Sequence, residues 1–392
     1  MKLYNVCDYV TERIDSQSLT TSNYISTENM LPNKEGITHA NNIPKGNVVA
    51  YNKGDILISN IRPYFKKIWQ ANINGGCSSD VLCIRAKSIV YSKFLFYLLS
   101  QQSFFDYVMS GAKGCKMPRG DKQQIMQWDI ELPRLNEQTI IANTLSSLDD
   151  KIELNRRINE NLEQQAQALF KSWFVDFEPF KDGKFVDSEL GMIPEGWSIN
   201  LVKDIAIFTQ GTQVPISMQY NTQKENMIRF IRIVDYTSNN TELPRFIYKT
   251  SKQTECDESD VIMVRYGNIG TIGRRLTGVI ANNLFKISPS NILTKNFLYY
   301  FFKQKEIQEL IVASAAGSAM PAIKHSTIGN INIIVPPKGI VTTFDLICNN
   351  YEAQILKNNQ ENSYLKEVRD TLLPKLMSGE LKLSEVETKL DE

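Results

Sequence analysis

Basic and amide side chains gather beside glycine and proline in two stretches near the start of the chain. The stretches read SNIRPYFKK at residues 59–67 and GAKGCKMPRGDK at residues 111–122. Arginine and lysine bind phosphates, asparagine and arginine also read base edges, and glycine lets a backbone approach DNA closely. An alternative is that both are solvated basic loops. The candidate nucleic-acid contacts are Asn60, Arg62, Tyr64, Lys66, Lys67, Lys113, Lys116, Arg119 and Lys122.

Three stretches of the second half carry a similar mixture: TQGTQVP at 209–215, VRYGNIGTIGRR at 264–275 and AGSAMPAIKHS at 316–326. Glutamine pairs well with adenine edges, and the glycines have GxxGxxG spacing, which differs from the GxGxxG of dinucleotide sites. We interpret His325 as a phosphate or base contact, because no Ser, Cys or Asp partner is placed to make it a catalyst. The candidates are Gln210, Thr212, Gln213, Arg265, Tyr266, Asn268, Arg274, Arg275, Ser318, Lys324 and His325.

The net charge of +1 conceals alternating basic and acidic blocks. Residues 1–136 and 195–338 each carry a net charge of +5, whereas residues 137–194 carry −5 and residues 339–392 carry −4. Long helices often have glutamate-rich faces, which explains the acidic blocks but not both basic ones. The basic blocks therefore keep nucleic acid open as a partner.

The cysteines and the hydropathy pattern indicate a cytoplasmic protein. The 6 cysteines lie far apart, with no CxxC motif and only 2 histidines, so we expect reduced thiols and no metal site. The sequence has no apolar run of membrane-spanning length, and its start, MKLYNVCDYVTERID, lacks the apolar region of a signal peptide.

The same order of signals occurs twice. GDILIS (54–59) and SDVIMV (259–264) each predict an alternating strand after an acidic turn, and residues 91–108 and 293–311 each predict amphipathic helices with an aromatic face. Pro118 and Pro321 are separated by 203 positions, as are Pro133 and Pro336. A constant separation over this span indicates an internal repeat.

Long helices are predicted after each copy of the repeat. A mainly apolar coiled-coil seam with steps of three, four and seven is predicted, and in the first helix it consists of Leu148, Ile152, Asn155, Leu162, Leu169 and Trp173. Asn155 and Asn358 hold equivalent seam positions, either buried to fix the register or at a wet edge. Because each helix alone would expose its apolar stripe, we expect the two helices to pair. The connection must return from the far end of the first helix, so we expect the pair to be antiparallel. From about Thr139 to Phe174 the first long helix would be roughly 54 Å long, at about 1.5 Å per residue.

An aromatic cluster ends the first long helix. Phe170, Trp173, Phe174 and Phe177 recur at helical spacing and favour one face. They could cap the neighbouring domain or the helix pair, or form a docking patch for a partner protein, because aromatic side chains dominate interface cores.

These observations predict an α+β fold with two similar mixed α/β domains separated by an antiparallel coiled coil, in a pseudo-two-fold arrangement. The expected segments are residues 1–136 (first mixed α/β domain), 137–180 (central helix), 181–194 (linker), 195–338 (second mixed α/β domain), and 339–392 (C-terminal helix and tail).

The chain resembles the specificity subunits of type I restriction–modification systems over nearly its whole length. The resemblance rests on LDDKIELNRRINENLEQQAQALFKSWFVDFEPF (148–180), GMIPEGW (191–197) and RDTLLPKLMSGEL (369–381), with GDILISNIRPYFKKI (54–68), VRYGNIGTIGR (264–274) and AGSAMPAIKHSTIGNINIIVPP (316–337). Two departures are evident. The first half begins almost directly at Leu3 without an IPEGW lead, and the second long helix lacks the FKSWFVDF tail.

The resemblance implies a non-catalytic subunit that binds double-stranded DNA, each domain reading one half of an asymmetric bipartite sequence. It also implies that the helices set the gap and dock two adenine methyltransferase subunits, with two motor-nuclease restriction subunits as further partners. S-adenosylmethionine, ATP and Mg²⁺ would be bound by those partners, and this chain would need no cofactor.

Two other classes of protein are disfavoured by the sequence. An enzyme that methylates or cuts DNA alone would need the [DN]PP[YF] motif of adenine methyltransferases, a P-loop or a nuclease motif, and the sequence contains none of them. A coiled-coil scaffold without a DNA role would not explain the two basic domains with polar, glycine-rich loops. Because the two sets of loops differ in sequence, we expect a target with unlike halves.

Overall fold

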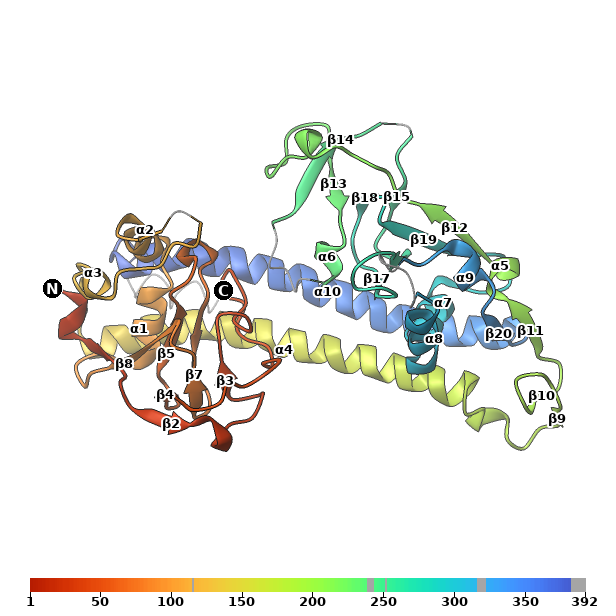
Figure 1. Ribbon diagram of the computed structural model, residues 1–392, viewed down its shortest axis with the longest axis horizontal. Helices are drawn as coiled ribbons and strands as arrows, with labels where there is room; N and C mark the ends of the chain where they lie inside the picture. The colour runs from red at the N-terminus through yellow and green to blue at the C-terminus, as the bar shows by residue number, and fades with distance from the viewer. Residues whose placement is uncertain (115, 238–242, 251, 316–321, 382–392) are drawn as a thin grey trace. The chain divides into compact units, whose positions relative to one another are not determined.

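The computed structural model describes residues 1–114, 116–237, 243–250, 252–315 and 322–381 (Figure 1). The chain packs into a first unit, formed by Met1–Leu154 with Glu361–Glu392, and a second unit, formed by Asn155–Gln360. The long helices α4 (Leu135–Phe174) and α10 (Lys338–Met377) each contribute one end to each unit. Both units are therefore built from both halves of the sequence.

The part of the first unit that precedes α4, hereafter the first sheet domain, contains sheets and short helices. One sheet has the antiparallel strand order β1-β8-β5-β6, and the other has the order β2-β4-β7-β3. The strands are β1 (Cys7–Tyr9), β2 (Arg13–Asp15), β3 (Tyr24–Ile25), β4 (Asn47–Tyr51), β5 (Ile56–Ser59), β6 (Ile68–Gln70), β7 (Gly75–Cys77) and β8 (Val81–Ala86). The helices are η1 (Leu3–Asn5), η2 (Ser16–Ser18), η3 (Pro63–Phe65), α1 (Ser92–Leu99), α2 (Gln102–Ser110) and α3 (Lys122–Met126).

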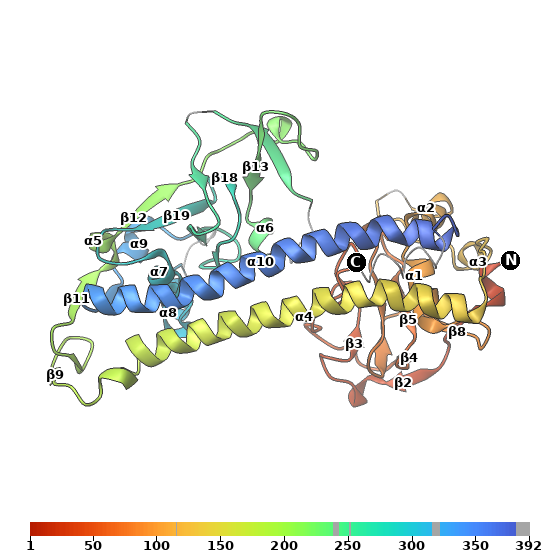
Figure 2. The ribbon, with the colours of Figure 1, turned by 180° about the vertical axis from the view of Figure 1, so that it is seen from behind.

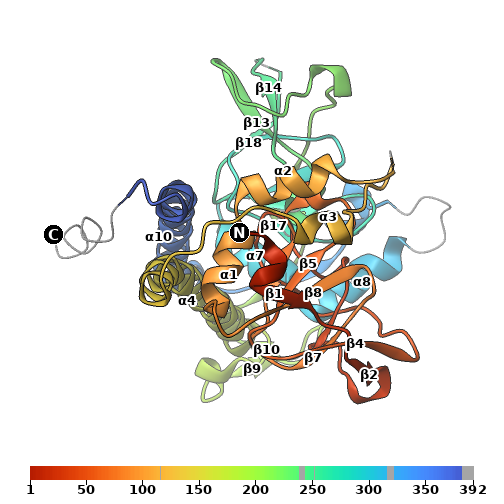
Figure 3. The ribbon, with the colours of Figure 1, turned by 90° about the vertical axis from the view of Figure 1, so that its left-hand side faces the viewer.

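Strand β5 is buried on both faces, which corrects the alternating pattern expected from its sequence. Ile56 and Ile58 share a core with side chains of α1 and α2, whereas Leu57 shares another with Cys77 of the second sheet. Figure 3 shows the ribbons of α1, α2 and β5. A strand covered on both sides reads as a continuous apolar run.

The second unit contains an equivalent second sheet domain. Its sheets have the strand orders β12-β19-β16-β17 and β14-β13-β18-β15, and shorter ladders pair β9 with β10 and β11 with β20. The strands are β9 (Phe185–Val186), β10 (Ile193–Pro194), β11 (Ser198–Leu201), β12 (Ala206–Gln210), β13 (Met227–Ile231), β14 (Arg245–Tyr248), β15 (Glu255–Cys256), β16 (Val261–Val264), β17 (Ile272–Gly273), β18 (Gly278–Ile280), β19 (Leu284–Pro289) and β20 (Asn332–Val335). The helices are η4 (Glu178–Phe180), α5 (Val202–Ile205), η5 (Ile216–Met218), α6 (Val234–Thr237), α7 (Lys295–Phe302), α8 (Lys305–Ala315) and α9 (His325–Gly329).

The internal repeat predicted from the sequence is confirmed in the helices. Helices α1, α2, α3 and α4 begin 203 residues before α7, α8, α9 and α10, respectively. The sheets that contain β5 and β16 also have equivalent strand orders. The other sheets share three strands, because β4-β7-β3 and β15-β18-β13 have the same pairing directions, but β2 adds at one edge and β14 at the opposite edge. The two sheet domains thus share a frame and differ at an outer strand.

Within each unit, α4 and α10 lie side by side and antiparallel (Figure 2). In the first unit, Asp149 pairs with Arg369 at 2.6 Å and Lys151 pairs with Glu361 at 3.5 Å. In the second unit, the Asn159 amide donates to Asn359 at 2.9 Å. Residue numbers rise along α4 as they fall along α10, which confirms the predicted direction of the coiled coil.

The seam asparagines are buried, which decides between the two alternatives left by the sequence. Asn155 is 1% exposed and Asn358 is 3% exposed. The Asn358 amide donates to Asn159 at 2.8 Å and accepts from Gln354 at 2.7 Å. A buried amide in a coiled-coil seam has its partner only in the correct register.

Both long helices complete the core of each sheet domain. In the first unit, Leu373 of α10 enters the core that contains Leu145 of α4. In the second unit, Phe170 of α4 enters the core that contains Phe344 of α10. Among the described residues the cysteines form no disulfide, and Cys7, Cys77, Cys83, Cys256 and Cys348 are buried.

Candidate nucleic-acid interface

The structure joins the two basic segments of the first sheet domain. Ile61 forms a β-bridge with Arg119, and the Arg62 amide donates to the Pro118 carbonyl at 2.8 Å. The Gly120 amide donates to the Asn60 carbonyl at 3.3 Å. Residues 59–67 and the described part of 111–122 therefore form one surface, hereafter the first loop junction.

The tip of this junction has an uncommon backbone. Arg62 and Lys66 flank the one-turn helix η3, and both have left-handed backbone angles with φ of 51°. Non-glycine residues rarely adopt this region, and such strain concentrates at functional sites. The tip presents Tyr64, which is 47% exposed, and its ring lies 4.7 Å from that of Phe65. Arg62 is half-buried with its Nε inside the protein.

The other cations of the first loop junction differ in their surroundings. Lys113 and Arg119 are exposed and pair with Asp121 and Asp80 at 2.8 and 3.1 Å. Lys67 donates to the Thr27 carbonyl at 2.7 Å, and burial together with Arg62 lowers the pKa of its ammonium. Lys66 is half-buried, whereas Lys116 and Lys122 are exposed.

Asn60 is buried, in contrast to the exposed position that its predicted role requires. It is 9% exposed, and its Oδ1 has no hydrogen-bond partner within the described ranges. Its backbone holds the junction together through Gly120 and Asp80. We therefore withdraw Asn60 as a direct base contact and assign it to the support of the loop.

The second sheet domain brings its polar segments together around Arg265. The Arg265 guanidinium donates to the Ile323 carbonyl at 3.1 Å and to the Gln210 side chain at 3.3 Å, and lies 5.0 Å from the Tyr266 ring centre. Tyr266 also forms a β-bridge with Ala322. Residues 209–215, 264–270 and 322–326 form the second loop junction, which repeats the joining of Ile61 to Arg119.

His325 is held between aromatic rings in this junction. It stacks on Phe208 with 5.5 Å between ring centres and meets the edge of Phe285 at 4.9 Å. Burial, and then the nearby Arg265, lowers the pKa of His325, which favours a neutral imidazole. Its Nε2 has no hydrogen-bond partner in the part of the chain that the structure describes.

The remaining candidates of the second loop junction divide by exposure. Gln213, Asn268 and Lys324 are exposed, whereas the Thr212 hydroxyl accepts from the Thr254 amide at 2.9 Å. Gly267 has φ of 74° and turns the chain at the loop tip. Ser318 lies outside the described residues. No group of acidic, histidine or cysteine side chains suited to a metal ion occurs among those described.

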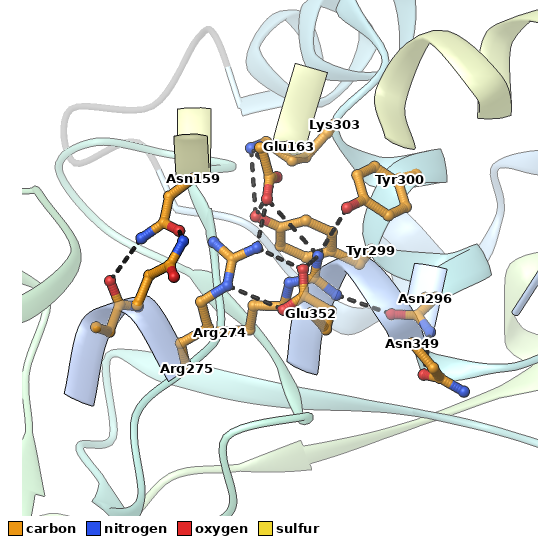
Figure 4. A network of polar contacts seen from close by, with 12 residues as sticks. Asn159, Glu163, Arg274, Arg275, Asn296, Tyr299, Tyr300, Lys303, Asn349 and Glu352 are labelled. Atoms are coloured by element: carbon orange, nitrogen blue, oxygen red, sulfur yellow. Dashed lines mark hydrogen bonds and ion pairs between the residues drawn. The ribbon is translucent and has the colours of Figure 1, made fainter. Parts of the chain in front are cut away.

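Arg274 and Arg275 lie in an internal ionic network (Figure 4), where the sequence had suggested nucleic-acid contacts. Arg274 is 7% exposed and donates to Asn296 at 2.9 Å, to Tyr300 at 2.8 Å and to Glu352 of α10. Arg275 pairs with the same glutamate and with Glu163 of α4. A buried guanidinium must be paired, and both are committed to carboxylates of the long helices. We therefore withdraw both arginines as nucleic-acid contacts.

The partners of these arginines were not identified from the sequence. Glu163 and Glu352 belong to acidic helical blocks whose sequence is typical of solvated faces. A sequence does not distinguish an exposed carboxylate from a paired one. The sequence signal for this network is the pair of consecutive arginines after β17, and that signal does not distinguish a nucleic-acid contact from an internal ion pair.

The aromatic cluster at the end of α4 belongs mainly to the core. Phe170 and Phe174 are 2% and 4% exposed and contact Phe297 with 5.0 and 4.8 Å between ring centres. Trp173 and Phe177 are half-buried at the rim. A cavity of about 710 Å³ lies beside Phe177, with Leu190, Phe301 and Leu310 in its wall. The packing alternative is confirmed for Phe170 and Phe174.

Two sheet domains with equivalent loop junctions, each packed against both long helices, are typical of a protein that binds through two similar domains. Residues 1–164 and 194–367 match the type I restriction modification DNA specificity domain. The chain belongs to this family. It is a specificity subunit for DNA target recognition and is non-catalytic.

Two relatives and one solved structure illustrate the similarity. The MjaIX specificity subunit of a type I restriction enzyme from Methanocaldococcus jannaschii is 32% identical over 314 residues, covering 76% of this chain and 71% of the relative. The HindI specificity subunit from Haemophilus influenzae is 26% identical over 448 residues, covering 95% and 97%.

The crystal structure of a type I restriction-modification S subunit from M. genitalium covers 96% of this chain and 95% of its own, with a TM-score of 0.55 at 16% identity. This likeness supports the α+β fold with two sheet domains and two long helices. No helix in the described part of the chain combines the length and the apolar character needed to cross a bilayer.

Proposed function

We propose that this chain reads an asymmetric, bipartite DNA sequence, with each sheet domain recognising one half. The observation that carries the proposal is the pair of equivalent loop junctions, one joining Ile61 to Arg119 and the other joining Tyr266 to Ala322. They occupy the same place in a repeated frame but carry different side chains. A shared frame with unlike tips suits two different half-sites.

In the first sheet domain, exposed cations are proposed to bind phosphates around an aromatic tip. Lys116 and Lys122 are exposed, and the exposed cations of Lys113 and Arg119 could exchange their half-buried carboxylate partners for phosphate at little cost. Tyr64 is presented toward solvent by the left-handed residues beside it, Arg62 and Lys66. Lys67, tied to Thr27, is proposed to support the loop.

In the second sheet domain, amide side chains and Arg265 are proposed to read base edges. Gln213 and Asn268 are exposed, and both side chains carry the donor and acceptor pair that suits adenine. Lys324 adds a phosphate contact. Gln210, Thr212, Tyr266 and His325 are held by their neighbours and are proposed to set the loop positions.

The long helices are proposed to fix the gap between half-sites and to dock two adenine methyltransferase subunits, and two motor-nuclease subunits could join them. Trp173 and Phe177 are the proposed docking side chains, because they lie at the rim while Phe170 and Phe174 are buried. S-adenosylmethionine, ATP and Mg²⁺ would be bound by the partners. The buried thiols favour a reducing cytoplasm.

The proposal is tested by methylome sequencing of a host that carries the methyltransferase partner with or without this chain. We expect one bipartite adenine-methylated motif that disappears when the chain is removed. Methylation that is unchanged without the chain would instead favour a scaffold with no role in DNA recognition.

A further inference from the structure

Equivalent positions of the two long helices carry opposite charges. Helices α4 and α10 begin and end 203 residues apart, so Glu163 is the counterpart of Lys366. Both residues lie in the helix end that reaches the sheet domain of the other half of the sequence. The ionic partners of these two residues can therefore determine which helix end packs against which sheet domain.

In the second unit, Glu163 of α4 is surrounded by cations and a phenol of the second sheet domain (Figure 4). Its carboxylate accepts from Lys303 at 2.9 Å and from Tyr299 at 2.8 Å, and it pairs with Arg275. The Glu163 side chain is 17% exposed. Burial alone would raise its pKa, but Arg275, Lys303 and Arg274 lower the pKa to about 2, so it is held as a carboxylate.

In the first unit the polarity is reversed. Lys366 of α10 pairs with Glu35 of the first sheet domain at 2.6 Å. Arg369 pairs with Asp149 at 2.6 Å, and Asp370 accepts from Lys34 at 3.1 Å. In the first unit the helix therefore supplies the cation, Lys366, and the sheet domain supplies the carboxylate. In the second unit the sheet domain supplies the cations and the helix supplies the carboxylate, Glu163.

The neighbouring positions strengthen the distinction. The counterpart of Arg369 on α4 is Ala166, which is fully buried, and the counterpart of Asp370 is Gln167. If the end of α10 lay against the second sheet domain, Lys366 would meet Arg275 and Lys303, and a guanidinium would replace a buried methyl group.

The opposite exchange is also unfavourable. If the end of α4 lay against the first sheet domain, Glu163 would face Glu35. Ala166 would leave Asp149 without Arg369, and Gln167 would leave Lys34 without its carboxylate. Like charges and unpaired half-buried charges both disfavour this arrangement.

We propose that Glu163 and Lys366 form a charge code that matches each helix end to its own unit. The code makes the two halves of one chain complementary to each other and disfavours a pairing of two copies in which the α4 end of one takes the place of the α10 end of the other. The repeated frame would otherwise permit this exchange, because the same elements recur at the same spacing. The inference does not depend on how DNA is read.

The test uses two full-length chains with different affinity tags, co-expressed and captured through one tag. The swapped variant, Glu163→Lys with Lys366→Glu, gives each helix end the charge that suits the wrong sheet domain. The matched neutral control is Glu163→Gln with Lys366→Gln. We expect the swapped variant to capture about tenfold more of the second chain than the neutral control does. Equal capture by the two would overturn the proposal.

A restored variant keeps the test decisive if the swapped chain does not fold. It adds Glu35→Lys and Lys303→Glu to the swapped pair, which returns opposite charges to the contact between residues 35 and 366 and to the contact between residues 163 and 303. We expect wild-type levels of cross-capture and a thermal unfolding midpoint closer to wild type than that of the swapped variant. A restored variant that unfolds no later than the swapped one would overturn the charge code.

Discussion

Arg265 donates through its guanidinium to the backbone carbonyl of Ile323 at 3.1 Å, and thereby fastens the loop after β16 to the segment that precedes α9. The same side chain reaches Gln210 at the end of β12. One arginine thus gathers three loops that are far apart in the sequence, and it is the centre of the second loop junction.

Replacing this arginine should damage the reading of one half-site. We expect Arg265→Ala to weaken specific DNA binding by the assembled methyltransferase by about 1–3 kcal/mol and to relax base preference in one half of the motif. Methylome sequencing and binding titrations measure both effects. Lys305→Ala, an exposed lysine on α8, is the control and should leave the motif unchanged. Relaxation of both halves would contradict the assignment.

Removing lysines from the first loop junction should weaken binding without changing the sequence that is read. Each of Lys116→Ala and Lys122→Ala is expected to reduce the slope of log affinity against log salt by about 1, because one phosphate contact is lost. Lys53→Ala is the control, since Lys53 precedes β5 while the junction follows it. A slope equal to wild type in both variants would remove these lysines from the interface.

Glu163 should make the second unit sensitive to acid. Its pKa is lowered from 4.5 to about 2, so its stabilising effect is present above pH 4.5 and is lost as the pH falls toward 2. The contribution at neutral pH is at most about 3 kcal/mol. We expect Glu163→Gln to lower the free energy of unfolding at pH 7 and to converge with wild type near pH 2. Chemical denaturation at several pH values measures this, and a constant difference would contradict it.

Substitutions of the aromatic residues of α4 should distinguish a role in core packing from a role in binding the methyltransferase. Phe170→Ala is expected to cost about 3–5 kcal/mol of stability, because it empties a buried site. Trp173→Ala should cost less stability but reduce capture of the methyltransferase subunit. Denaturant unfolding and co-purification distinguish the two effects. If Trp173→Ala binds the methyltransferase as wild type does, the proposed docking role is wrong.

The sequence predicted the repeated frame because periodicity and spacing carry that information. The constant separation of Pro118 from Pro321 anticipated the equivalent helices, and the seam around Asn155 anticipated the antiparallel pair. The edge strands β2 and β14 were not anticipated, because short strands at a sheet edge have little periodic signal. Their difference shows that the frame, but not the outer strands, is repeated.

The surroundings of charged side chains were harder to predict. Arg274 and Arg275 stand beside a glycine turn, as an exposed loop arginine would, yet both are paired with helix carboxylates. Asn60 likewise follows a strand end but is buried beneath the loop. Whether a polar residue is exposed depends on elements that are distant in the sequence, such as α4 and α10 for the two arginines. The local residue types therefore do not predict its exposure.

The most direct test of the bipartite account is to replace residues 1–136 with the corresponding region of a relative that has a different target, and to sequence the methylome. The account predicts a new motif in which one half changes while the other half and the gap between them are retained. A change in both halves, or no change in either, would contradict the claim that each sheet domain reads its own half of the target.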